Sequence, residues 1–401
     1  MTLSATETDA VAALDAEAML AQVETWAAIN SGTGNLSGLA TMAAMLGDSF
    51  AVLPGEIQLV EPAPVETIAA NGRAVALDHG RHLTLSVRPD APVQLLLTGH
   101  MDTVYPVDHA FQTVARIDQA TLGGPGVADM KGGLAVMLAA LRAVETTPLA
   151  ARIGYTVVVN SDEETGSLSS AALLAETARG KLAALTYEPA LPDGTLAGAR
   201  GGTGNFSILV RGRSAHAGRN PEDGRNAIVA AADLALRSSK TAGAGLTVNP
   251  ARIDGGGPNN VVPDQAVLRI NFRPADDAAI DRARAQLDAA VSAVAADHDV
   301  AITVHGGFNR PPKPIDADAA RLFALVKDAG ADLGLDIGWR ATGGVCDGNN
   351  IAAAGVPVID TMGVRGGAIH SPDEFMLIDS LAERAALSAV TILRLAGRGR
   401  L

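Results

Sequence analysis

The chain has 401 residues and carries 44 acidic against 31 basic side chains, a formal net charge of −13. Such a surface argues against nucleic acid and anionic membrane as main partners, although simple solubility explains the charge equally well. Nearly half of the residues are apolar but only 3% are aromatic, so the core must be mainly aliphatic. The single cysteine, Cys346, excludes an intrachain disulfide and a zinc site built from cysteines.

The N-terminal segment has no basic start and no unbroken apolar stretch, so we expect no signal peptide. No apolar run reaches the roughly 18 residues of a membrane-spanning helix. These features predict a protein with no membrane partner and a cytoplasmic location.

Helical and strand-like segments alternate through the first 200 residues. The opening helix is expected at about 14–29, and the apolar run at 93–99 is typical of a buried strand in a mainly parallel sheet. This alternation predicts an α/β layer structure. The segments that continue it are a helix at 131–145, a strand at 152–160, a helix at 169–178 and a strand at 182–187.

The pattern changes near residue 200, where the order becomes β-α-β-β-α-β, as in a small ferredoxin-like sandwich. A proline-rich link at 310–314 follows, and the helix–strand alternation then resumes. We therefore predict a mixed, mainly parallel α/β domain formed by 1–200 and 313–401, with an inserted ferredoxin-like α+β domain at 201–312. The segments of the insert are strands at 203–211, 246–253, 265–272 and 300–305, and helices at 226–239 and 276–297.

Five short motifs place metal-ligand side chains after apparent strands or in glycine-rich turns, where functional groups of α/β sheets gather. Each has a plainer interpretation by itself. His100 and Asp102 can cap a turn, Asp129 can cap a helix, and the acidic run 162–164 can be a solvated turn. The agreement among all five favours a metal site. The motifs are GHMDTV, GVADMKGG, NSDEETGS, TYEPA and GGAIHSPDE.

Local chemistry suggests which of these residues bind metal, which orients a ligand and which acts as a base. Asp102 stands two positions after His100 and can accept the second ring N–H, which leaves the other nitrogen for a metal. In the acidic run, Glu164 can bind metal while Glu163 remains free as a base, provided that Gly166 lets the backbone turn. A set of nitrogen and oxygen ligands suits zinc, with cobalt or manganese as substitutes.

In order and spacing, the five motifs resemble those of the dizinc metallopeptidase family that includes glutamate carboxypeptidase, acetylornithine deacetylase, succinyl-diaminopimelate desuccinylase and aminoacylase. The resemblance covers essentially the whole chain. It implies two zinc ions per subunit, a general base and a residue that orients the first histidine. The implied roles are Asp129 as the bridging ligand, His100 and Glu188 on one metal, Glu164 and His370 on the other, Glu163 as the base, and Asp102 as the orienting residue.

The resemblance also assigns roles outside the metal motifs. His216 could simply cap a helix, but in this family such a histidine reaches into the partner subunit's site and stabilises the oxyanion, which implies a homodimer built on the inserted domain. Arg273 and Asn260 would hold the substrate's terminal carboxylate. The loop with Gly344 and Asp347 resembles a glycine-rich substrate loop, in which Cys346 stands where Ser or Thr is usual.

The sequence thus predicts zinc-dependent hydrolysis of an amide or peptide bond next to a free carboxylate. The substrate would be a small N-acyl amino acid or peptide, and the enzyme a glutamate-type carboxypeptidase or N-acyl-amino-acid amidohydrolase. A biosynthetic deacylase resembling acetylornithine deacetylase or the desuccinylase is the alternative. A silent dimeric binding protein would lack ligands or a base, and none is missing. A closed structural zinc site would leave no use for Glu163.

Overall fold

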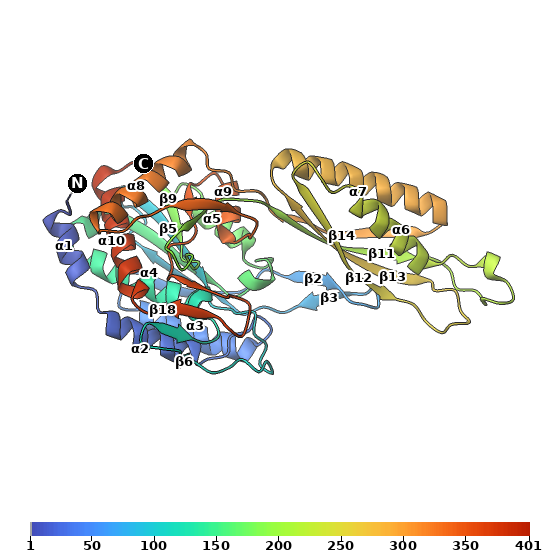
Figure 1. Ribbon diagram of the computed structural model, residues 1–401, viewed down its shortest axis with the longest axis horizontal. Helices are drawn as coiled ribbons and strands as arrows, with labels where there is room; N and C mark the ends of the chain where they lie inside the picture. Colours follow the sequence, from blue (N-terminus) through green and yellow to red (C-terminus); the bar gives the residue numbers. More distant parts are fainter. Residues whose placement is uncertain (1) are drawn as a thin grey trace.

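The protein is described here by a computed structural model of residues 2–401 (Figure 1). A larger α/β part holds both chain termini, and a smaller part projects from it as a layer of strands with two helices. Among residues 2–401, no helix is long and apolar enough to cross a membrane.

The larger part is built on a six-stranded sheet with the strand order β1-β4-β8-β5-β9-β16. The last four of these strands run parallel, and β1 and β4 form an antiparallel edge. The strands are β1 (Glu56–Val60), β4 (His82–Val87), β8 (Ile153–Asn160), β5 (Val93–His100), β9 (Ala183–Thr186) and β16 (Val358–Ile359).

Helices cover both faces of this sheet, and alternation along β5 explains its three successive leucines, Leu95, Leu96 and Leu97. Leu95 and Leu97 point into the main core with helices α4, α10 and α2, whereas Leu96 points to the opposite face with α5 and α9. The helices of this part are α1 (Ala5–Ala12), α2 (Ala16–Ala27), α3 (Leu36–Phe50), α4 (Gly132–Glu145), α5 (Ala171–Ala178), α8 (Ala317–Asp332), α9 (Asp347–Ala353) and α10 (Ser380–Arg398).

The N-terminal helices differ from the single expected helix. Ser4 forms a capping box with Glu7 that starts α1, and the Asp15 side chain caps α2 by accepting from Ala18 N–H. The expected helix at 14–29 is therefore α2, and α1 precedes it. The sequence prediction also omitted α3, which begins after the cap Asn35.

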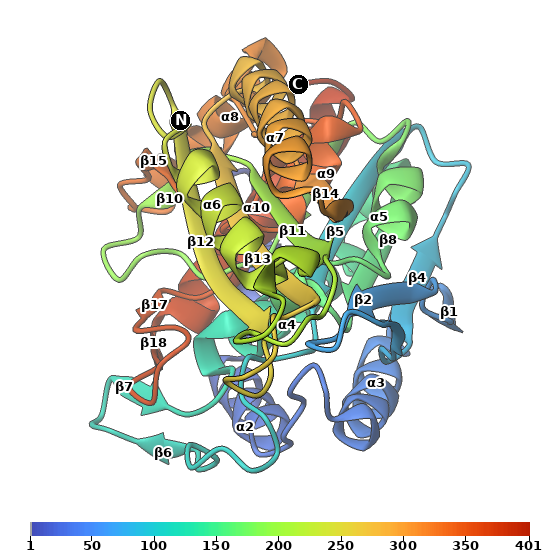
Figure 2. The same ribbon diagram turned by 90° about the vertical axis from the view of Figure 1, so that its right-hand side faces the viewer.

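The smaller part is a four-stranded antiparallel sheet with the order β12-β13-β11-β14. Figure 2 shows α6 and α7 lying over one face of this sheet, where Phe206, Ile208 and Val210 of β11 enter the core. The chain order is β-α-β-β-α-β, as predicted. The elements are β11 (Thr203–Arg211), α6 (Ala227–Ser239), β12 (Leu246–Gly255), β13 (Gln265–Pro274), α7 (Asp277–His298) and β14 (Ala301–Arg310).

The predicted fold class is confirmed, because the chain forms an α/β part with a mainly parallel sheet and a separate ferredoxin-like unit is inserted into it. Strand β14 is longer than expected, extending to Arg310 instead of ending near 305, and it pairs with β11 along its length. The domain boundaries at 200/201 and 312/313 stay a prediction. In the structure the two crossings between the parts are Gly201–Gly202 and Pro311–Pro312.

Short elements complete the molecule. The hairpin of β2 (Val65–Ile68) and β3 (Ala74–Leu77) extends from the larger part toward the inserted sheet (Figure 1). Ile68 of this hairpin packs on Leu209 and Val267 of that sheet. Strands β10 (Leu196–Arg200) and β15 (Trp339–Thr342) pair in parallel. A four-stranded sheet is formed by β6 (Ala115–Arg116), β7 (Thr121–Gly123), β17 (Gly366–Gly367) and β18 (Phe375–Leu377). Single turns are η1 (Val127–Lys131), η2 (Pro148–Arg152), η3 (Glu163–Thr165) and η4 (Pro221–Asp223).

Candidate metal centre and active site

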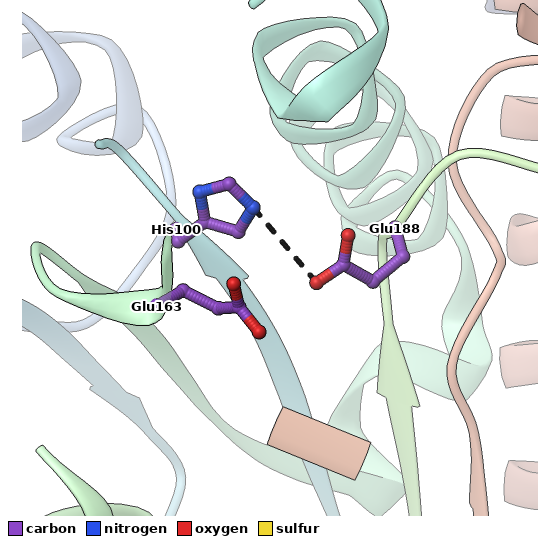
Figure 3. A group of neighbouring side chains, drawn as sticks. All are labelled: His100, Glu163 and Glu188. Atoms are coloured by element: carbon purple, nitrogen blue, oxygen red, sulfur yellow. Dashed lines mark ion pairs between the residues drawn. The ribbon is translucent and has the colours of Figure 1, made fainter. Parts of the chain in front are cut away.

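His100 is the last residue of β5, and its ring points at the carboxylates of Asp129, in the turn η1 before α4, and of Glu188, just after β9. Its Nε2 lies 3.1 Å from Asp129 Oδ1 and 3.8 Å from Glu188 Oε1, the second contact being drawn in Figure 3. Its Nδ1 faces Asp102, at 3.0 Å from the carbonyl oxygen and 3.4 Å from the carboxylate. A proton held on Nδ1 leaves Nε2 as a metal donor, and the Asp102 carbonyl is the nearer acceptor.

Asp129 occupies the centre of the site. Its backbone is extended (φ −114°, ψ 87°) and α4 begins only at Gly132, so the interpretation of Asp129 as a helix cap is wrong. Its second oxygen, Oδ2, lies 3.2 Å from His370 Nε2. Gly133 lets α4 approach the strand end that carries Glu188, because a Cβ there would stand 2.0 Å from the Tyr187 carbonyl oxygen.

Glu163 and Glu164 are presented by the single turn η3. The Asp102 carboxylate accepts the N–H groups of both residues, each at 3.2 Å, and the Thr33 hydroxyl at 2.7 Å. Gly166 ends the turn with φ 102°, the left-handed conformation that glycine adopts without strain. Asp102 therefore supports both the first histidine and the acidic turn.

The five predicted metal ligands lie together. His370 Nε2 is 3.2 Å from Glu164 Oε2 as well as from Asp129 Oδ2, and its side chain is about half exposed. Glu188, placed just after β9, joins His100 on the other side of Asp129. The arrangement is two groups that share Asp129, one with His100 and Glu188 and one with Glu164 and His370.

These side chains perturb one another strongly. Burial raises the pKa of Glu188, and the neighbouring Asp129 raises it further; the same two causes raise the pKa of Glu164. Hydrogen bonds to Asp129 and Glu164 raise the pKa of His370 to about 10. Burial opposes the charge of Asp129, but His100 and His370 still hold its pKa well below the usual range.

The residues present fit a pair of divalent cations. Ligand atoms of His100, Glu163 and Glu188 lie within 4.8 Å of one another, as do those of His100, Asp129 and Glu164. So many buried carboxylates repel one another unless protons or cations balance them. All donors are nitrogen or oxygen, and the cluster opens onto a cavity, as in a catalytic site rather than a closed structural one.

Glu163 differs from the ligands in its surroundings. Burial raises its pKa to about 7, an effect that Arg310 opposes. Its Oε1 lies 2.8 Å from Arg310 Nη2 as an ion pair, but no aligned hydrogen bond reaches that oxygen. Figure 3 shows its carboxylate turned toward His100 and Glu188 without an ion pair to either. A carboxylate so placed can take up and release a proton beside the cluster.

A cavity of about 570 Å³ adjoins the cluster and is lined by Gly344, Cys346, Arg200 and Arg340. Asp347, predicted to bind substrate, is not among the lining residues. Its carboxylate is fully buried and accepts from Asn160 Nδ2 at 2.8 Å, so it supports the site from behind the cavity wall. Burial raises the pKa of the Cys346 thiol, which disfavours a nucleophilic thiolate.

Three predicted residues lie on the inserted part and do not line this cavity. His216 and Asn260 are neighbours, since Ala217 N–H donates to the Asn260 carbonyl at 3.0 Å. Arg273 is exposed near the other end of β13, where its Nε donates to Asn271 Oδ1 at 2.9 Å. Within a single chain these side chains are not part of the cavity beside the predicted metal ligands, and their roles stay predictions.

Two supporting residues were given no role by the sequence. Glu374 accepts the N–H groups of Ala128 and Asp129 at 3.0 and 3.1 Å and the Tyr105 hydroxyl at 2.8 Å, so it fixes the backbone that presents Asp129. It stands in the motif GGAIHSPDE, so a local signal existed. Arg310, 147 residues after Glu163, had none.

An α/β fold with a ferredoxin-like insert, and a buried histidine–carboxylate cluster that opens onto a cavity, define a metallohydrolase. Residues 96–394 match the model of peptidase family M20/M25/M40, and the chain belongs to this family. The predicted family and the predicted enzyme class are confirmed.

Two curated proteins and one solved structure show the extent of this similarity. The chain is 29% identical over 392 residues to carboxypeptidase G2 of Pseudomonas sp. (strain RS-16), covering 96% of this chain and 90% of that protein. It is 29% identical over 281 residues to a succinyl-diaminopimelate desuccinylase of Pseudoalteromonas translucida, covering 66% and 73%. The fold matches the crystal structure of a tripeptidase from Staphylococcus aureus with a TM-score of 0.75 at 24% identity, over 96% of this chain and all of that one.

Proposed function

We propose that the protein hydrolyses an amide or peptide bond next to a free carboxylate and releases a C-terminal amino acid. It would act as a glutamate-type carboxypeptidase or an N-acyl-amino-acid amidohydrolase. The observation that carries this proposal is the buried Glu163 carboxylate beside a ligand cluster that opens onto a substrate-sized cavity. Similarity to carboxypeptidase G2 over nearly the whole chain supports the same class.

Two zinc ions are the proposed cofactors, with Asp129 shared between them. His100 and Glu188 would hold one, and Glu164 and His370 the other. When bound, such cations lower the pKa of a water and polarise the scissile carbonyl. Cobalt or manganese would suit the same ligands.

The chain's own residues supply the proton transfers and the alignment. Glu163 accepts a proton from the attacking water and delivers it to the leaving amine. Asp102 orients the His100 ring through its backbone carbonyl and holds the turn of Glu163 through its carboxylate. Glu374 holds the backbone of Asp129.

Cationic residues of the cavity support an anionic substrate. Arg200, which lines the cavity, and the buried Lys313, which does not, both pair with one buried carboxylate, Asp360, at 2.7 and 3.1 Å, so these three residues carry one positive charge in excess. Within residues 2–401, Arg340 lines the cavity without an ion pair. In the proposed dimer, Asn260 and the partner-directed His216 would complete the site, with Arg273 as a further carboxylate ligand.

Amino-acid release from N-acyl amino acids that share one acyl group tests the proposal, with added zinc and again after chelation. Release that chelation abolishes supports the hydrolase, and preference for C-terminal glutamate supports the carboxypeptidase. N-succinyl-diaminopimelate and N-acetylornithine are assayed separately, because their acyl groups differ. Turnover restricted to one of these two compounds would favour the alternative, a biosynthetic deacylase, which the similarity to the desuccinylase supports. No release from any compound would reject the proposal.

A further inference from the structure

The inserted part is joined to the catalytic part by two crossings that are tied to each other. Arg200 and Lys313 exchange two backbone hydrogen bonds, both of 2.9 Å. The Asn349 side chain, fully buried, donates to the Gly201 carbonyl at 2.9 Å and to the Pro311 carbonyl at 2.7 Å. Both crossings are therefore held at one point of the catalytic part, and any rotation of the inserted sheet about this point would also shift the contact of Ile68 with Leu209 and Val267.

Arg310 stands where the second crossing leaves the inserted sheet. It is the last residue of β14 and pairs with Thr203 of β11, so its backbone follows the orientation of the inserted sheet. Its side chain, however, is buried in the catalytic part, with 4% of its surface exposed. Any rotation of the inserted sheet is thus transmitted to the guanidinium.

One nitrogen of the Arg310 guanidinium, Nη2, faces more hydrogen-bond acceptors than it has hydrogens. Nη2, with two hydrogens, faces Glu163 Oε1 at 2.8 Å, the Glu163 carbonyl at 3.1 Å, Ser167 Oγ at 2.7 Å and Asp347 Oδ1 at 3.3 Å. Nε is buried and has no partner. A buried N–H without a partner is costly. A small shift of β14 that gave the Arg310 Nε–H an acceptor would therefore be favoured.

The geometry points to Arg310 as a positioning residue that couples the orientation of the inserted part to the placement of the catalytic base Glu163. When the inserted sheet turns, the competing acceptors redistribute around Nη2, and the hold on Glu163 Oε1 changes with them. Alignment of the base is thereby tied to closure of the inserted part over the substrate. This inference rests on the proposed function, because it takes Glu163 as the base.

Steady-state kinetics of R310Q test the coupling, with R269Q as the matched control. Arg269 also joins the two parts, donating to the Ile68 carbonyl at 2.7 Å, but it bonds Ser207 and Asp254 and does not contact Glu163. We expect R310Q to lower kcat on the order of 10²-fold with KM and metal content near wild type, since misplacement of a reacting group costs about that much. R269Q should keep the wild-type kcat.

A double-mutant cycle separates positioning from a merely structural effect. In an E163D background the shortened side chain is already displaced, so R310Q should cause little further loss of kcat. Full additivity, an equal kcat loss in R269Q, or an R310Q effect confined to KM would overturn the coupling. If R310Q fails to fold, R310K takes its place in the same cycle.

These variants also distinguish failure of the proposed function from failure of the Arg310 coupling. A wild-type protein that releases no amino acid would reject the proposed function, and an active E163Q variant would remove Glu163 as the base. An enzyme that E163Q inactivates and R310Q leaves unchanged would reject only the coupling.

Discussion

At the residue scale, the proposed proton-transfer carboxylate, Glu163, differs from the proposed metal ligands in its environment. Glu164 and Glu188 lie beside histidines, whereas Glu163 lies against Arg310. The E163Q variant should therefore retain two metal ions and lose about 10²- to 10⁴-fold in kcat, the usual contribution of a general base. Kinetics and elemental analysis of the purified variant measure both quantities. Loss of metal together with activity would mean that Glu163 is a ligand.

Glu374 gives a second prediction at this scale. Its carboxylate accepts two backbone N–H groups at Asp129, and E374Q removes the charge and half of the acceptors. We expect metal affinity to fall about 10- to 100-fold, as for other groups that support ligands, with unchanged folding. Competition with a coloured chelator measures the affinity. D373N, altering a neighbouring exposed carboxylate, is the control and should bind metal as wild type does.

Buried His82 gives a pH dependence of stability. Burial lowers its pKa below the usual value near 6.5, an effect that Asp162 and Asp102 oppose and His79 reinforces. The unfolded chain then binds the proton more readily, so stability is lost as pH falls below about 6.5 toward the folded-state pKa. Thermal melting between pH 5 and 7.5 should show this decline, and H82Q should flatten it. An unchanged slope in H82Q would exclude His82 as the cause.

At the scale of elements, glycines in α4 set how closely the helix approaches the strand ends. A Cβ at Gly133 would meet the Tyr187 carbonyl oxygen at 2.0 Å, next to the proposed metal ligand Glu188. G133A should cost about 1–3 kcal/mol by overpacking and should also weaken metal binding.

The matched control for G133A is G397A, in helix α10. A Cβ at Gly397 would have no heavy atom within 4 Å, so that variant should be stabilised by about 0.5–1 kcal/mol. Denaturant unfolding compares the two variants. Equal effects of both substitutions would contradict this account of helix packing.

At the scale of the whole molecule, His216 lies on the inserted part and outside the cavity of its own chain. If it serves the partner's site, mixing inactive H216A and E163Q subunits should restore activity. A mixed dimer then has one site with both groups intact. Refolding the two variants together and assaying amino-acid release tests this. Continued inactivity, with mixed dimers shown by mass spectrometry, would place His216 in its own subunit's chemistry.

The sequence alone determined the family, the α/β architecture with its insert, and the residue types of the metal site. Strand ends and glycine turns carry local signals, so His100, Asp129 and Glu188 could be proposed as metal ligands without coordinates. Element ends were less certain, because caps such as Asp15 and the pairing of β14 with β11 decide them.

Only the tertiary structure decided which side chains support which. Asp347 carries the right motif for a substrate loop, yet packing places its carboxylate behind the cavity wall against Asn160. Arg310 ends β14, next to the proline-rich link, and no motif marks it, yet the fold brings it 2.8 Å from Glu163. Contacts between residues so far apart depend on how sheets and helices pack, and no local pattern in the chain encodes that packing.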